Sequence, residues 1–333
     1  MLLTPSQTRT LFKHALAERY AILAVNADSP AAVLDALEAA RQCQSPVIVE
    51  TSLWQLTGHS FGHGDPFLGM TRYLTDLAVL GQSERYRNVP IVYHTDHIKG
   101  AITVSLLQHA IRGLEISHDG QELRLSASSI SLDSSELSAE ENLATIATLC
   151  ETAREAGVDA TLEMEAGVDD GVTSLDEARA LFGAAETANP GYLALWAPGV
   201  GTKHGLGSAG GFEPEAVARH QRLASELAGR PIGIALHGSS GLDTAQLKAA
   251  VAAGVSKVNW SSESLLIRSG AAREFYQTHQ KQLTKGHAEF KETAMDNGVQ
   301  SAVSAVYVPR VVERMKALGS NEKATPFMEA LAG

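Results

Sequence analysis

Short runs of branched apolar residues alternate along the chain with longer segments in which apolar positions recur at helical spacing. This alternation is typical of repeated strand and helix units that build a parallel sheet. We count about eight strand-like runs, the number that closes a (β/α)8 barrel. The predicted strands cover residues 20–27, 46–52, 90–97, 129–135, 160–167, 192–199, 232–239 and 255–262.

The segments between these runs carry start signals for helices. The predicted helices cover residues 30–44, 139–156, 214–228 and 244–253. Ser29 precedes a proline, Glu141 follows Ser138 at capping-box spacing, and Asp243 stands before its helix. No linker or low-complexity tract divides the chain. We therefore expect one α/β TIM-barrel domain over residues 1–333, with the barrel at about 18–280 and a C-terminal helical extension at about 281–333.

Composition and charge describe an ordinary globular chain of 333 residues, 44% of them hydrophobic and 20% charged. The net charge of −11 provides no broad basic surface for nucleic acid or anionic lipid, so any phosphate needs a local site. Cys43 and Cys150 lie inside predicted helices, and no secretory leader pattern or apolar stretch of roughly 18 to 20 residues is present. These features favour a cytoplasmic protein without a membrane partner.

Unusual polar residues fall at or just beyond the carboxyl ends of the predicted strands. In a TIM barrel these ends meet on one face, where the active site is built from several strands at once. The residues are Asn26, Ser52, Asp96, His97, Asp133, Ser135, Glu165, His204, His237, Ser240 and residues 259–262. Positions that are distant in the sequence are therefore expected to be neighbours in space.

Three histidines in this set suit a metal ion. His97, His204 and His237 follow the third, sixth and seventh strands, and three imidazoles can bind Zn²⁺ with one position left open. One loop histidine alone is more often a surface residue, but three at equivalent positions favour a shared site. The glycines after two of them, Gly205 and Gly238, allow the backbone to approach a ligand closely. His94 is expected to have a packing or supporting role.

Two turns rich in glycine and serine, at residues 237–241 and 259–262, follow the seventh and eighth strands. Many barrels bind a phosphate at this location through backbone amides and a helix N-terminus. A plain turn that caps a helix is the alternative. No Walker or dinucleotide fingerprint is present, since the glycine-rich residues 199–211 lack the Lys-Ser/Thr ending and its strand-turn-helix context.

The order and spacing of short motifs resemble the class II, zinc-dependent ketose-bisphosphate aldolases, which include the fructose- and tagatose-bisphosphate aldolases. The resemblance extends from about residue 20 to about residue 268. Its motifs are His-Thr-Asp-His at 94–97, Ser-Leu-Asp-Ser-Ser at 131–135, Leu-Glu-Met-Glu at 162–165, Gly-Thr-Lys-His-Gly at 201–205, His-Gly-Ser-Ser-Gly at 237–241 and Gly-Val-Ser-Lys-Val-Asn at 254–259. Together they imply a TIM barrel that carries a metal-dependent lyase.

The resemblance also implies roles for individual residues. His97, His204 and His237 match the zinc ligands, and Asp133 and Glu165 match acidic residues that bind a second divalent cation in some members. Asp96 matches the acid-base residue at the bond being broken. The positions that match contacts to substrate are Asn259 for the enediolate, Asn26 and Ser52 for the pocket, and Gly205, Gly238, Ser240, Ser261 and Ser262 for the C1 phosphate, often with a monovalent cation such as Na⁺ or K⁺.

The expected activity is reversible cleavage of a phosphorylated ketose, by default fructose 1,6-bisphosphate, to dihydroxyacetone phosphate and an aldehyde. Zn²⁺ stabilises the enediolate as a Lewis acid, and no lysine Schiff base is required. Asp96 exchanges the hydroxyl proton, a role worth roughly 10² to 10⁴ in rate. Its alternative is to cap a helix or support His97. A small phosphorylated sugar and a homo-oligomer, either a dimer or a tetramer, are the expected partners.

The chain departs from the family after the fifth strand, where the loop from Glu165 is short. Asp169 or Asp170 is the candidate for the second acid-base residue. Glu136 stands where a histidine is common in the family, and residues 206–211 form an unusual run of glycines and small residues. Arg310 does not align with the arginine that holds a distal phosphate in some members. The sequence therefore leaves open which aldehyde is the acceptor substrate. A non-catalytic aldolase-like subunit remains an alternative, as does a metal-dependent hydrolase, although no His-x-His pair follows the first strand.

Overall fold

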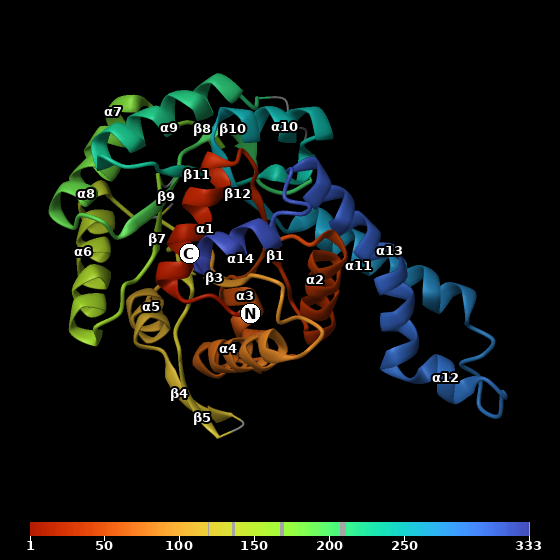
Figure 1. Cartoon of the computed structure of the whole chain (residues 1–333). Helices are drawn as coiled ribbons and strands as arrows, with labels where there is room; N and C mark the ends of the chain where they lie inside the picture. The colour runs from red at the N-terminus through yellow and green to blue at the C-terminus, as the bar shows by residue number, and fades with distance from the viewer. Residues whose placement is uncertain (119, 135–136, 167–169, 207–210, 333) are drawn as a thin grey trace.

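Eight parallel strands close into a barrel in the computed structural model, which describes every residue except 119, 135–136, 167–169, 207–210 and 333 (Figure 1). The strands, in their order around the barrel, are β1 (Ile22–Asn26), β12 (Val255–Trp260), β11 (Gly233–Leu236), β9 (Leu193–Ala197), β7 (Leu162–Glu165), β6 (Ser129–Ile130), β3 (Ile91–Thr95) and β2 (Val47–Thr51). The predicted (β/α)8 fold is confirmed. The strand predicted at 129–135 is shorter, because only β6 keeps ladder hydrogen bonds.

Alternate residues of the strands point into the barrel and change from apolar to polar toward the carboxyl ends. Ile22 of β1 and Val92 of β3 belong to the inner apolar cluster. His94 and Asp96 follow Val92 at a period of two, and Asn26 follows Ile22 in the same way. All of these side chains are buried. The inside of the barrel is therefore an apolar plug at one end and a polar site at the other.

Helix α1 (Pro5–Ala17) covers the amino end of the barrel, and no helix was predicted there. It begins with Pro5 after a Thr4 and Gln7 capping box, and it contacts β9, β11 and β12. Its buried Phe12 joins the inner apolar cluster. Helix α14 (Ala324–Ala332) packs on α1 and adds Phe327 to this cluster (Figure 1). This end of the barrel is thus closed to ligands by apolar side chains.

The outer layer is helical, as the periodicity predicts. Helices α6 (Ala139–Ala156), α9 (Pro214–Ala228) and α10 (Thr244–Ala253) have the predicted bounds, and α2 (Pro30–Cys43) ends one residue early. Ser29, Ser138 and Asp243 cap their helices through side-chain oxygens. The other helices around the barrel are α3 (Leu53–Thr57), α4 (Pro66–Gln82), α5 (Thr103–Arg112), α7 (Leu175–Ala178), α8 (Ala184–Ala188) and α11 (Ser262–Thr278), with a π-helical turn at Arg179–Gly183 between α7 and α8.

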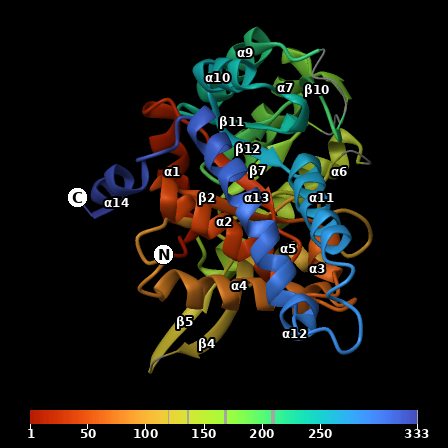
Figure 2. The same cartoon turned by 90° about the vertical axis from the view of Figure 1, so that its right-hand side faces the viewer.

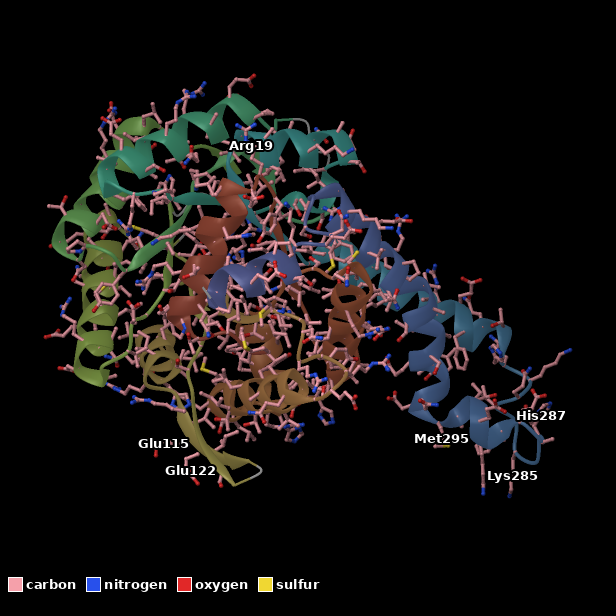
Figure 3. The ribbon with its side chains drawn as sticks, viewed as in Figure 1. Arg19, Glu115, Glu122, Lys285, His287 and Met295 are labelled. Carbon is pink, nitrogen blue, oxygen red and sulfur yellow. The ribbon has the colours of Figure 1, made fainter. Side chains whose placement is uncertain are left out.

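Two antiparallel strand pairs outside the barrel were not predicted. Strands β4 (Leu114–His118) and β5 (Gln121–Leu125) project from the barrel, and Figure 3 labels Glu115 and Glu122 on them. Strand β8 (Asp170–Val172) pairs with β10 (Val200–Lys203), with Asp170 opposite Lys203. This second pairing ties the loop after β7 to the loop after β9, and residue 204 follows it directly.

The C-terminal extension contains α12 (Phe290–Ala294) and α13 (Asp296–Ala317) before α14. Helix α13 packs against α2 and α11 (Figure 2), and Arg268 of α11 and Ser304 of α13 both bond to Asp35 of α2. The end of α11, α12 and the start of α13 project as an arm, whose tip carries Lys285 and His287 (Figure 3). None of the helices described in these ranges is long and apolar enough to cross a membrane.

The apolar plug predicts a stability effect for Phe12→Ala. Phe12 is 2% exposed, so its removal leaves a cavity and should lower the free energy of unfolding by roughly 3 to 5 kcal/mol. Denaturant unfolding followed by circular dichroism measures this change. Lys13→Ala, at the exposed neighbouring position of the same helix, is the control. A loss below about 1 kcal/mol for Phe12→Ala would show that α1 does not seal the barrel.

Candidate active site

A pocket at the carboxyl end of the barrel gathers residues that follow seven of the eight predicted strands. It is lined by Asn26, Ser52, Trp54, Gln55, Asp96, His97, Lys99, Asp133, His204, Gly205, Gly238, Ser239, Ser240, Asn259, Ser261 and Ser262. Thirteen of these positions were predicted from the sequence as site residues or as parts of the anion-binding turns. The closed barrel therefore brings together polar residues that are far apart in the sequence, such as Asn26 and Ser262.

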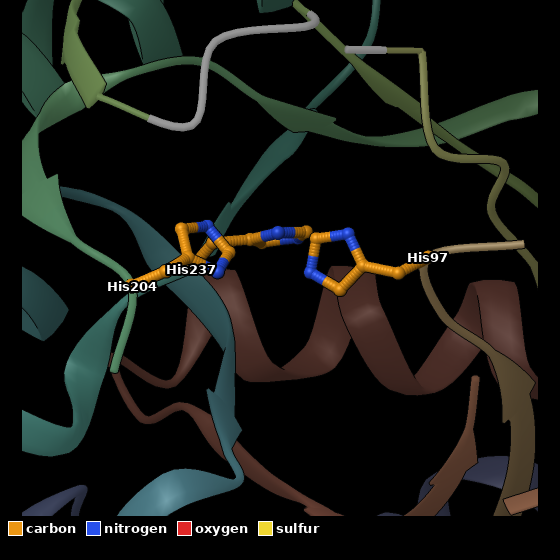
Figure 4. A group of neighbouring side chains, drawn as sticks. All are labelled: His97, His204 and His237. Carbon is orange, nitrogen blue, oxygen red and sulfur yellow. The ribbon is translucent and has the colours of Figure 1, made fainter. Parts of the chain in front are cut away.

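The three predicted histidines converge at this pocket (Figure 4). The ring centroids of His97 lie 5.2 Å from His204 and 5.1 Å from His237, and the latter two are 6.1 Å apart. One nitrogen of each ring lies within 4.8 Å of a nitrogen of the others, so they can share one ion. This donor set fits Zn²⁺, which accepts imidazole nitrogens in a tetrahedral site.

His97 has an unusual backbone, with a φ of 47° in the left-handed region. Consecutive strand residues normally point to opposite faces, yet Asp96 and His97 both line the pocket. The left-handed turn after β3 allows this, at a conformational cost of about 1 to 3 kcal/mol. The strain lies at the residue that would bind the metal, which is where functional strain is commonly found.

Carboxylates surround the His97 ring. Its Nδ1 lies 3.5 Å from Asp133 and its Nε2 lies 3.9 Å from Asp96, and buried Glu165 lies near both rings of His97 and His237. Burial opposes a positive charge on His97, but Asp96 and the other carboxylates raise its pKa to about 11. The surroundings therefore stabilise positive charge at this position, whether it comes from a proton or from a cation.

His237 is oriented from below by Glu163. Its Nε2 lies 3.0 Å from Glu163 Oε1, and because the carboxylate accepts this hydrogen bond, Nδ1 is the nitrogen with a lone pair for a metal ion. The second oxygen of Glu163 lies 3.0 Å from the ammonium of Lys257. Burial raises the pKa of Glu163, but Lys257 together with His237 and His94 holds that pKa well below its usual range. A charged, fully buried carboxylate thus fixes the ring, as in the carboxylate and histidine pairs of many metal sites.

Lys257 lies at the centre of a buried polar layer one step below the pocket. Its Nζ is 3.1 Å from His94 Nε2 and 3.4 Å from Glu50, and none of these side chains is exposed. Burial, followed by the charge of Lys257, lowers the pKa of His94 to about 3, so this ring is neutral. Its Nδ1 pairs with the Ser129 hydroxyl at 2.7 Å. These contacts place His94 in the layer below the pocket, the position expected of a residue with a supporting role.

Asp96 is held between two amides at the floor of the pocket. Asn259 donates to Oδ1 at 2.9 Å and Asn26 donates to Oδ2 at 3.3 Å. Burial raises the pKa of Asp96, but the charges of His97 and Lys257 lower it to about 2. The carboxylate is therefore ionised at neutral pH and is placed to accept a proton from a bound hydroxyl group.

The predicted phosphate cradle is formed by the loop after β11 and the start of α11. Gly238 has a φ of 66°, and a Cβ there would lie 2.8 Å from the carbonyl oxygen of Lys203, so only glycine lets these two loops meet. Glu263 N–H donates to Ser240 Oγ at 3.3 Å. The Ser261 side chain makes no capping bond to α11, so the N–H groups at the start of that helix, apart from that of Glu263, can face an anion. Arg314 of α13 donates to the Ser239 carbonyl at 2.6 Å and holds the loop.

The structure does not place the side chains of the two candidates for the second acid-base residue. Asp169 belongs to the residues that the structure does not describe, as do Ser135 and Glu136. The backbone of Asp170 begins β8 opposite Lys203, next to His204. Both candidates therefore remain predictions.

Several residues of this region were not predicted from the sequence: Glu50, Trp54, Gln55, Lys99, Glu163 and Lys257. Two of them carried a usable signal, since Glu163 and Lys257 stand two positions before Glu165 and Asn259 and so share their inward face. Nothing in the local sequence marked Trp54 or Lys99. Trp54 lies on the short helix α3 and Lys99 lies in a loop, and the position of both relative to the pocket depends on the assembled barrel.

Comparisons with known proteins agree with the resemblance. The family model "Fructose-bisphosphate aldolase class-II" matches residues 6–323. A fructose-bisphosphate aldolase of Mycoplasma pneumoniae is 26% identical over 95% of this chain and 98% of its own, and fructose-bisphosphate aldolase 1 of Paracoccidioides lutzii is 28% identical over 80% and 79%. A solved fructose-bisphosphate aldolase from Campylobacter jejuni shares the fold, with a TM-score of 0.79, 23% identity and coverage of 96% and 95%. The YdjI aldolase from Escherichia coli K12 does so with a TM-score of 0.69, 20% identity and coverage of 97% and 100%.

The contact between Glu163 and His237 predicts a change in metal affinity. Glu163→Gln keeps the shape of the side chain but removes the charge that fixes the ring, and we expect zinc affinity to fall about 10- to 100-fold. Competition with a chromophoric chelator measures the dissociation constant. Glu155→Gln on the exposed side of α6 is the matched control. Equal affinity in Glu163→Gln and the control would contradict the orienting role.

Proposed function

Because this chain belongs to the class II fructose-bisphosphate aldolase family, we propose that it is a zinc-dependent lyase that reversibly cleaves a phosphorylated ketose to dihydroxyacetone phosphate and an aldehyde. Fructose 1,6-bisphosphate is the default substrate. The observation that carries this proposal is the convergence of three imidazoles on one pocket that also holds the ionised Asp96 and a glycine- and serine-rich cradle.

His97, His204 and His237 would hold the zinc ion, and its bound form supplies Lewis-acid stabilisation of the negative charge that develops during cleavage. Asp133 and Glu165 are the candidates for a second divalent cation, since both are buried beside His97. A monovalent cation, Na⁺ or K⁺, near the phosphate is a further expectation. The donor set of three imidazoles favours zinc over magnesium or calcium, which prefer oxygen ligands.

Residues of the chain perform the proton transfers and the positioning. Asp96 takes the proton of the hydroxyl group at the bond being cleaved and returns it during condensation. The amides of Asn26 and Asn259 fix its two oxygens, so the carboxylate is oriented before the substrate arrives. Asp169 or Asp170 supplies the second proton transfer, at the carbon that becomes part of dihydroxyacetone phosphate.

The substrate phosphate binds at Gly205, Gly238, Ser240, Ser261 and Ser262. Backbone N–H groups at the start of α11 and the small side chains around them suit a dianion. Ser52 and Asn26 lie on the opposite flank of Asp96 and contact the rest of the sugar.

Lysine chemistry offers a second route for aldolases in general, and the barrel does contain a lysine close to the site. Lys257 is fully buried and lies 3.0 Å from Glu163. Burial lowers its pKa, but Glu163 and Glu50 outweigh this effect and raise the pKa above the usual range. A protonated amine is not a nucleophile, which supports the metal route over a Schiff base.

Self-association into a dimer or tetramer is proposed from the projecting arm. Tyr276, Met295 and Val306 are 45%, 62% and 49% exposed there, which is unusual for large apolar side chains. Cytoplasmic location likewise remains a proposal.

The metal assignment predicts the behaviour of His204→Ala. Loss of one of three ligands should remove zinc and cleavage activity together, as should treatment of the wild-type protein with a chelator. Metal content by mass spectrometry and release of dihydroxyacetone phosphate in a coupled assay are measured on the same samples. The control is His287→Ala, on the exposed tip of the arm. Full zinc occupancy in His204→Ala would refute this ligand set.

The acid-base assignment predicts a different result for Asp96→Ala. The variant should keep its zinc, because the three imidazoles remain, yet cleave fructose 1,6-bisphosphate at least about 10²-fold more slowly. Turnover number and metal content are again compared with wild type. A near-normal turnover number would rule out Asp96 as the proton acceptor.

A further inference from the structure

Trp54 is an exposed indole in the wall of the active-site pocket. It is 86% exposed, whereas Trp196 and Trp260 are 0% and 1% exposed. It lies on α3, just after Ser52, and lines the same pocket as Asp96 and His97. An indole has a large apolar face, and its exposure in a concave polar pocket is typical of a surface that packs against a ligand.

The wall around Trp54 has few donors left for an anion. The N–H and hydroxyl of Ser52 both donate to Gln55 Oε1, at 2.8 Å and 2.6 Å. The N–H of Trp54 donates in turn to Ser52 Oγ at 3.2 Å. Gln55 itself is buried. Both donors of Ser52 and the N–H of Trp54 are thus engaged, whereas a phosphate dianion needs several free donors or a cation.

Cationic charge on this side of the pocket is already neutralised. Among the described lining residues other than the histidines, Lys99 is the one cationic side chain, and its ammonium lies 3.6 Å from Asp133. Asp96 and Asp133 add negative charge to the same flank. A second phosphate here would meet carboxylates and an indole instead of a cradle like that formed by Gly238 and Ser240.

Trp54 lies where one half of the substrate would bind. The cradle follows β11 and β12, and β1 and β2 come next around the barrel. A sugar whose phosphate lies in the cradle and whose reacting hydroxyl faces Asp96 extends toward the residues after β1 and β2. Those residues are Asn26, Ser52, Trp54 and Gln55. The part that is released as the aldehyde would therefore lie against the indole.

We propose that the substrate is a ketose 1-phosphate whose other end carries hydroxyl groups and no second phosphate, and that Trp54 stacks against this end. The inference rests on the proposed lyase activity and replaces its default substrate, fructose 1,6-bisphosphate, with a substrate class that lacks the second phosphate. In the cleavage step the bond between C3 and C4 breaks and its electron pair stays with C3. The C4 hydroxyl proton passes to Asp96, so an uncharged aldehyde leaves, and protonation of C3 then gives dihydroxyacetone phosphate.

The test compares fructose 1-phosphate with fructose 1,6-bisphosphate in the zinc-loaded enzyme. We expect kcat/KM to favour the 1-phosphate by more than about 3-fold. A smaller preference, or preference for the bisphosphate, overturns the proposal. Exchange of a hydrogen of dihydroxyacetone phosphate with deuterated water is measured in parallel by NMR, since it requires the lyase site but no aldehyde. Absence of both exchange and cleavage would refute the proposed function itself.

Two variants at Trp54 test the stacking contact. Trp54→Ala should lower kcat/KM for fructose 1-phosphate about 10-fold, with a clearly smaller effect on the exchange reaction, and Trp54→Phe should keep most of the activity because a ring remains. Leu68→Ala, a 45% exposed position on α4, is the control for loss of an exposed apolar side chain. Equal loss in cleavage and exchange, or no loss in Trp54→Ala, overturns the contact.

A variant at Lys99 tests the main rival. If Lys99 held a distal phosphate, Lys99→Met would lower kcat/KM for the bisphosphate more than for the 1-phosphate, and that outcome would overturn the proposal. We expect the ratio of the two values to stay within about 3-fold of the wild-type ratio.

Discussion

The ammonium of Lys257 is the group that keeps the Glu163 carboxylate charged inside this barrel. Glu163 and Glu50 are completely buried beside it, and the pKa of Glu50 is raised well above its usual value by burial and by the charge of Asp96. With Lys257 present, Glu163 stays charged and can hold the His237 ring from below. Removing one partner of a buried pair usually costs about 3 to 5 kcal/mol, because the other charge is left without compensation. The geometry of the metal ligands therefore depends on a residue that touches no ligand.

The interior of the barrel is organised in layers for the same reason. Residues two apart on a strand share a face, so Val92, His94 and Asp96 occupy successive layers from apolar to catalytic. Neutral His94 and charged Lys257 form the middle layer, which separates the apolar plug from the pocket. Each layer contains residues from several strands, so the site is held as rigidly as the sheet itself. Loops then add the features that the sheet cannot supply, such as the left-handed His97 and the indole of Trp54.

The two halves of the pocket have different chemistry. Glycines and a helix start without a side-chain cap from Ser261 lie on one side, where the N–H groups other than that of Glu263 can face an anion. On the other side both donors of Ser52 are bonded to Gln55 Oε1, beside an exposed ring. An enzyme with one anion cradle and one apolar wall discriminates between the two ends of its substrate. This asymmetry arises from which loop follows which strand, and it would remain unchanged if the metal ligands were replaced.

The sequence by itself determined the barrel, most helix bounds and the residues that gather at the carboxyl ends of the strands. Periodicity and capping are local properties, and eight repeats of one unit leave few topologies, so Ser138 or Asp243 could be assigned from a few neighbouring residues. The motifs also identified the three histidines as a set. Only the tertiary structure decided which groups touch. The contact of Glu163 with His237, the pairing of β8 with β10 and the place of Trp54 in the wall join segments far apart in the chain. Their distances are set by closure of the whole barrel, and no local pattern encodes them.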